Sequence, residues 1–505
     1  MELRFFGATG TTTGSCHMIT NGPHSVLLDC GFYQGRREES QRRNSSFAFD
    51  PRNVTAVVQS HAHIDHSGKL PMLVRHGFRG RIHATRATLD LSDVLLRDCA
   101  HIMLADAEHL NAHRGERARD RAPARERNGD APHDRLQADL PAPADPHQRA
   151  APELDPGPDE AVPLYFEEDV VRTLQQFVGH EYAEWFEAAP GMRFRFRDAG
   201  HILGSAWIEA EIGAGNEKRN LVFTGDYGRK DQPILRDPEP LGDADVYISE
   251  STYGDRLHPA FVDMDADLEA AVRRLADRGR GRLIIPAFAV GRTQNILYSL
   301  GKIFRSGACP PVHVAVDSPL ATAATRIVAE HPECFDAEAL VEFQRLQQDD
   351  CFRPHLQFTD SKQESIALNA DPRPTIVISA SGMMENGRIL HHLAHWIGSA
   401  ETEILVVGFQ AQHTLGRRIL EGAHEIKIFG VPHAVRARVT PMLGMSAHAD
   451  KNGLLEALVP HADRAQACFL VHGEDDQRKP LAAELSRRGF AKVVTPADPE
   501  IYRIG

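Results

Sequence analysis

Cysteine is scarce in this sequence, and its spacing matches no metal-binding or disulfide pattern. Seven cysteines are spread over 505 residues, their number is odd, and no Cys-x-x-Cys pair occurs. This spacing argues against a cysteine-based zinc site and against a disulfide framework. It is typical of reduced thiols, so we expect a cytoplasmic protein.

Long apolar runs and an excess of positive charge are also absent. No run approaches the roughly 18 apolar residues of a membrane-spanning helix, and the first residues lack the pattern of a signal peptide. The net charge of −13 disfavours general binding to polyanions. A nucleic-acid substrate would therefore need a local basic groove or a metal that overcomes the field of the whole chain.

Histidine, by contrast, is plentiful, and four metal-capable side chains fall within six residues. His61, His63, Asp65 and His66 follow an apolar run that we expect to form a buried strand. A helix aligns only residues three or four apart, so these side chains must converge from a tight loop. Imidazoles and a carboxylate suit Zn²⁺ better than manganese or iron.

One pattern recurs elsewhere in the chain: an apolar strand followed by a single metal-capable or acid/base residue. The residues in this position are Asp29, His201, Asp226, Glu250 and His472. Each of them alone could be an ordinary cap or turn residue. Together they indicate strand ends that converge on one site.

Two further regions differ from the rest in composition and in their pattern of expected strands and helices. Residues from about 112 to 162 are rich in Arg, Asp, Ala and Pro, and they lie between helices expected at 86–111 and 167–180. This composition predicts a mobile loop that is dispensable for chemistry. The arginines also leave an RNA-binding arm open, although the many acids weaken that interpretation. Between about 252 and 443, strands and helices alternate, which predicts a mostly parallel sheet.

The loops of this second region carry candidate phosphate-binding residues. They are Arg292, Ser379, Ser381 and Gly382. Small polar residues before a helix can present backbone N–H groups to a phosphate. Ordinary N-capping explains such residues equally well, so both interpretations stay open at this point.

With these motifs in hand, the chain resembles the β-CASP group of metallo-β-lactamase-fold hydrolases. That group comprises RNA-processing nucleases, among them the endonuclease subunit of the mRNA 3′-end cleavage factor and its bacterial relatives. The matching positions are Asp29, the run His61–His66, His201 in Ala-Gly-His-Ile-Leu-Gly-Ser, Asp226 in Thr-Gly-Asp-Tyr, Glu250 in Glu-Ser-Thr-Tyr-Gly, His448 in Ser-Ala-His-Ala-Asp and His472 in Val-His-Gly. The resemblance covers nearly the whole chain except residues 112–162, a segment longer than is typical of the group.

The resemblance implies an α/β architecture, a metallo-β-lactamase αββα sandwich with an inserted β-CASP parallel α/β domain. The sandwich would comprise residues 1–252 and 444–505, and the insertion residues 253–443. Two zinc ions per chain are implied. The first would take His61, His63 and His201 and the second Asp65, His66 and His472, with Asp226 bridging the two.

The resemblance also implies roles around the metals. Asp29 would orient the ligands rather than bind metal. Asp65, Asp226, Glu250 and His448 would be catalytic, with His448, polarised by Glu250, protonating the leaving oxygen. The implied function is a zinc-dependent ribonuclease that hydrolyses single-stranded RNA through a hydroxide activated by two metals, by an endonucleolytic mode with 5′-exonuclease activity left open.

Three alternatives remain beside this reading: a DNA nuclease, another hydrolase on the same fold such as a thioesterase or lactamase, and a non-catalytic RNA-binding subunit. The filled ligand positions and the added Glu250, His448 and His472 favour the ribonuclease. The sequence does not decide the cellular RNA or whether the protein forms a homo-oligomer.

Overall fold

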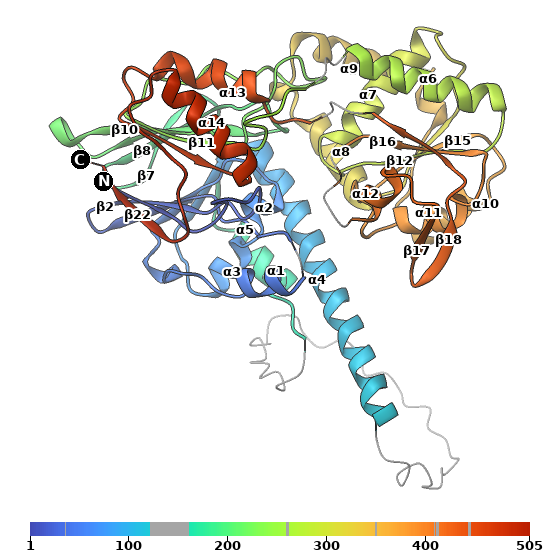
Figure 1. Ribbon diagram of the computed structural model, residues 1–505, viewed down its shortest axis with the longest axis horizontal. Coiled ribbons are helices and arrows are strands. Elements are labelled where there is room, and N and C mark those ends of the chain that lie inside the picture. Colours follow the sequence, from blue (N-terminus) through green and yellow to red (C-terminus); the bar gives the residue numbers. More distant parts are fainter. Residues whose placement is uncertain are drawn as a thin grey trace.

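Two lobes lie side by side in the computed structural model (Figure 1). It describes residues 1–35, 37–121, 161–258, 262–348, 351–408, 410, 414–442 and 446–504. The first lobe holds both ends of the chain, because β22 pairs antiparallel with β1. The second lobe is formed by the middle of the chain, so the first lobe is built from two separated parts of the sequence.

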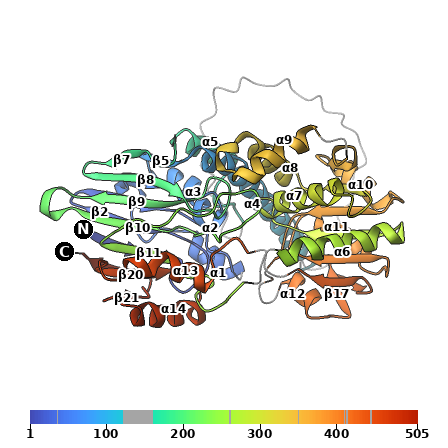
Figure 2. The same cartoon turned by 90° about the horizontal axis from the view of Figure 1, so that it is seen from above.

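Two seven-stranded sheets face each other in the first lobe. In spatial order, the first sheet contains β22 (Glu500–Arg503), β1 (Glu2–Phe5), β2 (His17–Asn21), β3 (His24–Leu28), β4 (Ala56–Val58), β5 (Arg81–Thr85) and β6 (Phe177–His180). The second contains β21 (Val493–Val494), β20 (Ala467–Val471), β11 (Val246–Glu250), β10 (Arg219–Phe223), β9 (Ala206–Ile212), β8 (Met192–Asp198) and β7 (Trp185–Ala189). Figure 2 shows the strands of the second sheet side by side.

Alternation along these strands places one apolar face of each sheet against the other. In β8, for example, Met192, Phe194 and Phe196 are fully buried between the sheets, whereas the arginines between them point outward. Period-two alternation of this kind is what a strand with one core face requires. The apolar layer between the sheets is therefore the central core of the lobe.

Helices cover the two outer faces of this sandwich. The helices of the first lobe are α1 (Arg37–Asn44), α2 (Ile64–Ser67), α3 (Leu70–Arg75), α4 (Arg86–Arg121), α5 (Glu167–Leu174), α13 (Lys451–Leu458) and α14 (Asp475–Arg487). The apolar side of α3 packs on the first sheet, with α4 and α5 against it, and α13 and α14 pack on the second sheet. The result is an αββα sandwich, whose layers are visible in Figure 1.

The second lobe is built on a six-stranded parallel sheet. Its strands, in spatial order, are β14 (Leu356–Phe358), β13 (His313–Val316), β15 (Thr375–Ser379), β12 (Arg282–Pro286), β16 (Thr402–Val406) and β19 (Arg438–Pro441). Its helices are α6 (Val262–Arg278), α7 (Arg292–Arg305), α8 (Pro319–Glu330), α9 (Ala337–Gln348), α10 (Lys362–Ala370), α11 (Ile389–Trp396) and α12 (Leu415–Leu420). Helices α6 and α7 pack on one face and α11 and α12 on the other, beside a hairpin of β17 (Glu425–Ile428) and β18 (Val431–Ala434).

The predicted fold class is therefore confirmed: an αββα sandwich with an inserted parallel α/β unit. The domain boundaries at residues 252 and 443 stay predictions. No helix in the described residues is both long and apolar enough to cross a membrane.

Two expected elements were wrong in their extent. The helix expected over 167–180 ends at Leu174, and residues 177–180 form β6, because that segment completes the edge of the first sheet beside β5. The helix expected over 86–111 continues to Arg121, so the predicted loop does not begin at 112. Residues 112–121 contain four arginines and two alanines, which are strong helix formers. The rest of the predicted loop, from 122 to 160, lies outside the described residues.

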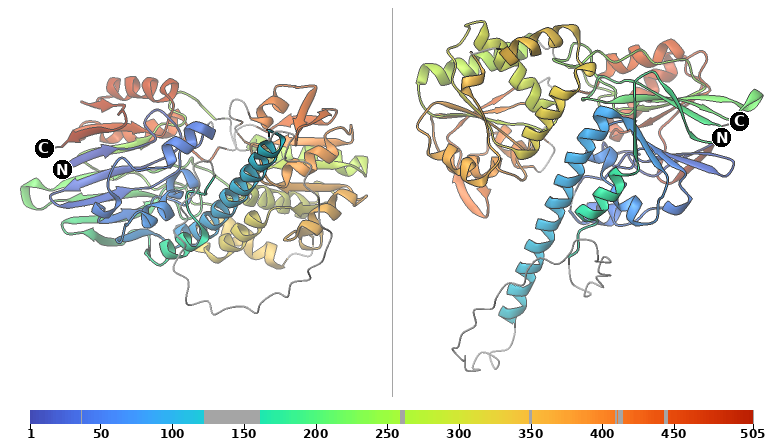
Figure 3. Two further views of the ribbon diagram at one scale, coloured as in Figure 1. Left: turned by 90° about the horizontal axis from the view of Figure 1, so that it is seen from below. Right: turned by 180° about the vertical axis from the view of Figure 1, so that it is seen from behind.

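Helix α4 lies along the seam between the lobes, where it packs against α8 (Figure 3). At this contact His331, which is buried, places Nε2 2.8 Å from Oδ2 of Asp90 on α4 and Nδ1 2.6 Å from Oε1 of Glu333. Burial opposes protonation of His331, but the two carboxylates outweigh burial and raise its pKa above the ordinary value. When protonated, His331 donates to carboxylates on both sides of the seam and so joins the two lobes.

This ion pair predicts a pH-dependent contribution to stability. The pKa of His331 is raised in the folded protein, so the contribution is fully present below the ordinary value of about 6.5 and is lost as the pH rises through the raised value. We expect the difference in melting temperature between the unmodified protein and His331→Gln to be largest at acid pH and to shrink toward alkaline pH. The exposed control His395→Gln should show no such trend, and a difference independent of pH would contradict the assignment.

Candidate metal centre and active site

The predicted site residues gather at one edge of the sandwich, where strands of both sheets end. Asp29 follows β3, and the loop His61–His66 follows β4 in the first sheet. The second sheet supplies His201 after β8, Asp226 after β10 and His472 after β20. The structure thus brings together residues that lie more than 400 positions apart in the sequence.

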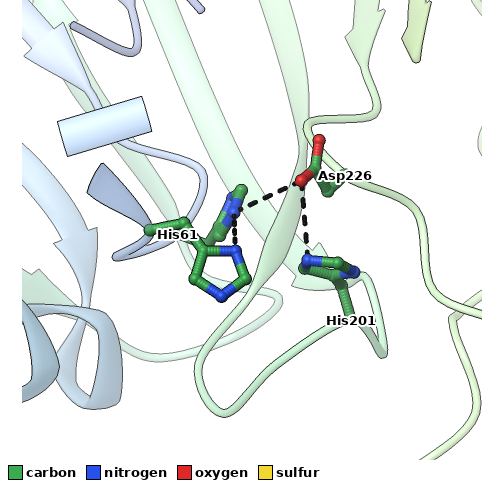
Figure 4. A group of neighbouring side chains, drawn as sticks. His61, His201 and Asp226 are labelled. Atoms are coloured by element: carbon green, nitrogen blue, oxygen red, sulfur yellow. Dashed lines mark hydrogen bonds and ion pairs between the residues drawn. The ribbon is translucent and has the colours of Figure 1, made fainter. Parts of the chain in front are cut away.

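The first group of ligand atoms comes from three histidines and one aspartate. His61, His63, His201 and Asp226 each present one ligand atom, and these atoms lie within 4.8 Å of one another. Nε2 of His61 is 3.1 Å from Nδ1 of His63, and Nε2 of His61 and of His201 are each 3.5 Å from Oδ2 of Asp226 (Figure 4). A tetrahedral zinc with bonds of about 2.0–2.1 Å spaces its ligand atoms roughly 3.3 Å apart, so these separations fit such an ion.

A second group, Asp65, His66 and His472, adjoins the first. Nε2 of His472 is 3.1 Å from Nε2 of His66 and 3.5 Å from Oδ2 of Asp65. Oδ1 of Asp226 lies 3.3 Å from Nε2 of His66 and 3.4 Å from Nδ1 of His472. Asp226 therefore turns one oxygen toward each group, which is the geometry of a bridging carboxylate.

Several of these buried atoms lack a protein partner. Both ring nitrogens of His201 and Oδ1 of Asp226 make no hydrogen bond with any residue in the described ranges. Burial lowers the pKa of His61, of His63 and of His201, so their imidazoles are neutral and keep a lone pair. Buried polar atoms without partners are costly, and neutral imidazoles beside a carboxylate are the donor set that zinc takes.

Asp29 holds the ligand loop, His61–His66, in place through hydrogen bonds. Its Oδ2 accepts from Nδ1 of His66 at 2.7 Å and from Oγ of Ser60 at 2.9 Å, and its Oδ1 accepts from the Ser60 amide at 2.7 Å. These bonds aim Nε2 of His66 at the second group. A Cβ on Gly31 would lie 1.7 Å from the carbonyl oxygen of Asp65, so only glycine lets the Asp29 loop approach the ligand loop this closely.

Two hydroxyl groups that the sequence reasoning missed fix the orientation of two further imidazoles. Ser60 donates to Asp29, which leaves its Oγ to accept from Nδ1 of His61 at 3.1 Å. Thr252 donates to the carbonyl oxygen of His472 at 3.0 Å, and its Oγ1 then accepts from Nδ1 of the same residue at 3.1 Å. Nε2 of His61 is left to face the ligand groups. Nε2 of His472 faces His66 and Asp65, while its Nδ1 also lies 3.4 Å from Oδ1 of Asp226. The only available signal was that Ser60 directly precedes, and Thr252 closely follows, a motif residue.

Glu250 and His448 form a pair at the edge of the cluster. Glu250 is fully buried, its Oε1 accepts from the Tyr227 amide at 2.5 Å, and its Oε2 lies 3.0 Å from Nδ1 of His448. Nε2 of His448 lies 4.0 Å from Oδ2 of Asp226. Burial would lower the pKa of His448, but the carboxylates of Glu250 and Asp226 raise it to about 9. His448 can therefore present a proton to the cluster.

The four candidate phosphate-binding residues lie in the second lobe. Arg292 begins α7, and a Cβ built on the preceding Gly291 would lie 3.7 Å from Ile202, the neighbour of His201. Ser379 is buried, and its hydroxyl donates to the carbonyl oxygen of Asp317 at 2.8 Å.

The other two candidates, Ser381 and Gly382, lie in the loop after β15, where Gly382 faces the ring of Phe288. Within the described parts of the chain, no hydrogen bond joins Ser379, Ser381 or Gly382 to the ligand groups.

Family comparisons agree with this site and fold. Residues 9–173 match the metallo-beta-lactamase superfamily, 293–419 the Beta-Casp domain, and 432–496 the Zn-dependent metallo-hydrolase RNA specificity domain. Ribonuclease TTHA0252 of Thermus thermophilus is 33% identical over 490 residues, which cover 97% of each chain. The chain therefore belongs to the β-CASP group of metallo-β-lactamase-fold hydrolases, and the resemblance seen in the motifs is confirmed.

More distant proteins are similar over most of the chain. The RNase J-like protein of Methanocaldococcus jannaschii is 27% identical over 479 residues, covering 94% of this chain and 92% of that protein. The transcription termination factor FttA of Methanosarcina mazei is 28% identical over 493 residues, covering 94% of this chain and 67% of that protein. A crystal structure of a protein of unknown function from Enterococcus faecalis V583 shares the fold, with a TM-score of 0.53, 10% identity and 99% of each chain covered.

The hydroxyl of Thr252 leads to a prediction about metal affinity. Groups that orient a metal-bound imidazole are typically worth 10–100-fold in affinity. We expect Thr252→Val to weaken metal binding by about ten-fold or more, because Nδ1 of His472 loses its acceptor, and Thr252→Ser to retain most of the affinity. Competition with a chromogenic chelator measures both, and equal affinity in the valine variant would show that Thr252 does not orient His472.

Proposed function

We propose that this protein is a zinc-dependent ribonuclease that hydrolyses phosphodiester bonds of single-stranded RNA, with an endonucleolytic mode. The observation that carries the proposal is Asp226, whose two oxygens face two separate groups of imidazole and carboxylate ligands. A carboxylate between two ions is the arrangement that two-metal phosphodiester hydrolysis needs. The name of the Thermus thermophilus relative, a ribonuclease, supports RNA as substrate.

The ligands divide naturally into two sets. His61, His63 and His201 would hold one zinc, and Asp65, His66 and His472 the other, with Asp226 shared. Zinc, when bound, lowers the pKa of a water toward about 7 and stabilises charge at phosphorus.

The balance of charge favours this occupancy. Asp29, Asp226 and Glu250 are buried, and Asp65 lies beside them. Uncompensated buried carboxylates are costly, and two divalent ions would balance these four.

Glu250 and His448 would supply the proton that the leaving 3′-oxygen needs. Glu250 accepts from Nδ1 of His448, so the proton on Nε2 is the one directed at the cluster. The buried carboxylate also stabilises the charged imidazole before transfer. Asp226 lies 4.0 Å from the same nitrogen and so ties the acid to the reacting centre.

RNA would reach this centre along the seam between the lobes, with Arg292 as a contact to the backbone. Burial lowers the pKa of Arg292 to about 10, so its guanidinium remains cationic at neutral pH, and its Nε makes no hydrogen bond with any described residue. Ser381 and Gly382 would add contacts from the loop after β15. Ser379, whose hydroxyl is committed to Asp317, would support that loop. Such local contacts counter the negative charge of the chain.

The two-metal assignment predicts the zinc content. Purified protein prepared with zinc should hold about two ions per chain, and His63→Ala should hold fewer because one ion loses a ligand. His424→Ala, at an exposed position away from the cluster, should keep the full content. Elemental analysis that finds one ion or none in the unmodified protein would count against the assignment.

The substrate is tested with RNA oligomers labelled at either end, with DNA of the same sequence as control. We expect internal cleavage of RNA, loss of activity with a chelator, and no activity in Asp226→Ala while the fold persists. Because phosphate contacts release counterions, cleavage at sub-saturating RNA should weaken with salt. If the enzyme hydrolyses a lactam or a glutathione thioester and ignores RNA, the proposal is wrong. A preference for DNA would identify the nuclease alternative, and RNA binding without cleavage the non-catalytic one.

The role of His448 predicts a selective chemical rescue. General acid catalysis typically contributes about 10²–10⁴-fold, so His448→Ala should lose turnover by that order while it retains zinc, and Glu250→Gln should lose less. When sulfur replaces the bridging 3′-oxygen of the substrate, the sulfur leaving group departs without needing a proton. This substrate should restore much of the rate in His448→Ala and little in Asp226→Ala. Equal behaviour of both variants would exclude His448 as the acid.

A further inference from the structure

An exposed aromatic ring lies at the carboxyl end of the parallel sheet in the second lobe. Phe288 closely follows β12, the strand between β15 and β16, and 42% of it is exposed. Its neighbours Ala287, Ala289 and Val290 are buried. Ligands of open parallel sheets bind in the crevice at the carboxyl ends of the strands. A single exposed apolar residue is common, but this ring has surroundings that suit a ligand.

Two glycines from the neighbouring strands support the ring. A Cβ on Gly382, in the loop after β15, would lie 3.1 Å from Cδ2 and Cε2 of Phe288, and one on Gly408, after β16, would lie 3.9 Å from Cε2. The buried side chain of Gln410 donates from Nε2 to the carbonyl oxygens of both glycines, at 3.0 Å and 3.2 Å. The Cδ2–Cε2 side of the ring is therefore held by glycine backbone, while part of its surface stays open to solvent.

The loop that carries Phe288 is closed at its base. The carbonyl oxygen of Phe288 accepts from the Thr293 amide at 3.3 Å and from Oγ1 of Thr293 at 2.9 Å. Thr293 lies in the first turn of α7, so the loop is tied to a helix. A ring on a fixed backbone loses little freedom when it contacts a ligand, which favours binding.

The same loop packs against the ligand loops of the first lobe. Val290 belongs to one buried apolar cluster with Ala62 and Ile202, which are sequence neighbours of the candidate ligand histidines. Phe288 precedes Val290 by two residues, so the Cα atoms of the two lie within about 8 Å of each other. The exposed ring therefore lies at the seam, on the side of the metal centre.

A cationic group accompanies the ring. Arg292 begins α7, four residues after Phe288, and its Nε makes no hydrogen bond with any described residue. Burial lowers the pKa of Arg292 to about 10, and the charges of the nearby Tyr253 and Arg229 also act on that pKa. The ring centroid of Tyr253 is 6.1 Å from that of His448. An apolar ring beside a guanidinium suits a nucleotide, whose base is flat and aromatic and whose phosphate is anionic.

We propose that Phe288 is a stacking platform for one base of the bound RNA, close to the phosphodiester bond that is cut. This role rests on the proposed function, and it adds a contact to a base to the contacts with the RNA backbone. Every base has a π face, so stacking on phenylalanine holds the strand without selecting its sequence. Bases in a duplex are stacked on one another, so the ring can receive only an unstacked base of a single strand. The platform therefore favours single-stranded over paired RNA.

The test removes the base and the ring separately and together. RNA oligomers carry one abasic ribose at successive positions around the cleavage site, and kcat and KM are measured with the zinc-loaded full chain. The abasic ribose at one position should lower kcat/KM roughly 5- to 100-fold, the usual value of one stacked base. The loss should fall mainly on KM, because stacking holds substrate and transition state alike. Phe288→Ala should lose as much with the intact RNA and show no further loss with the abasic ribose at that position.

Two further variants and a control separate stacking from general packing. Phe288→Tyr keeps a flat ring and should keep both the affinity and the penalty for the abasic ribose. Phe288→Leu keeps apolar bulk without a ring, should lose most of both, and serves if Phe288→Ala does not fold. Phe429→Ala, at the turn between β17 and β18, removes a phenylalanine that is 59% exposed and should match the unmodified protein with every oligomer.

The outcomes separate this role from the ribonuclease assignment. If RNA is cleaved but the abasic penalty is the same in Phe288→Ala or Phe288→Leu as in the unmodified protein, the stacking role is wrong and the assignment stands. If the unmodified protein neither binds nor cleaves RNA, both proposals are wrong.

Discussion

The carboxylate of Asp226 is the interaction on which the site depends. Burial alone would raise its pKa, but the imidazoles around it, led by His472 and His66, hold the pKa well below its usual range. A charged oxygen is thereby maintained between two sets of ligands. Both sets draw on the loop His61–His66 after the first sheet, and each takes one histidine, His201 or His472, from the second sheet. The opposed sheets of the sandwich thus meet, at one edge, in a cluster of imidazoles and carboxylates of the kind that binds metal.

Residues next to the ligands orient the imidazoles of this arrangement through hydrogen bonds. Asp29 orients His66, Ser60 orients His61, and Thr252 orients the imidazole of His472. The two hydroxyls are each fixed in turn by a second bond: Ser60 donates to Asp29, and Thr252 donates to the carbonyl oxygen of His472. Imidazoles aimed in advance lose little freedom when a metal binds, which is why such neighbours matter to affinity almost as much as the ligands.

The second lobe takes part through the seam rather than through ligands. His331 pairs with Asp90 on α4, and residues 334–336 bond to the segment around Ile234. Arg292 follows Gly291, where a Cβ would lie 3.7 Å from Ile202, the neighbour of His201. These contacts across the seam fix the position of one lobe relative to the other.

The sequence by itself determined the parts of this protein whose signal is local. Strict alternation predicted β8, the apolar runs predicted the parallel strands, and the spacing of His61 to His66 predicted a ligand loop after a strand. It erred where tertiary pairing overrode local pattern, as at residues 177–180, where the edge of a sheet captured a segment that reads as helix. Hydroxyl residues such as Thr252 carry no distinctive pattern, since a threonine near a strand end is common.

Only the tertiary structure decided which atoms face each other. That Asp226 divides its two oxygens between two groups, and that residues 334–336 bond to residues 234–236 across the seam, both follow from contacts between segments far apart in the chain. Local sequence fixes the backbone preference of each segment. The side-chain distances that make a site are set by the packing of whole sheets and lobes against one another.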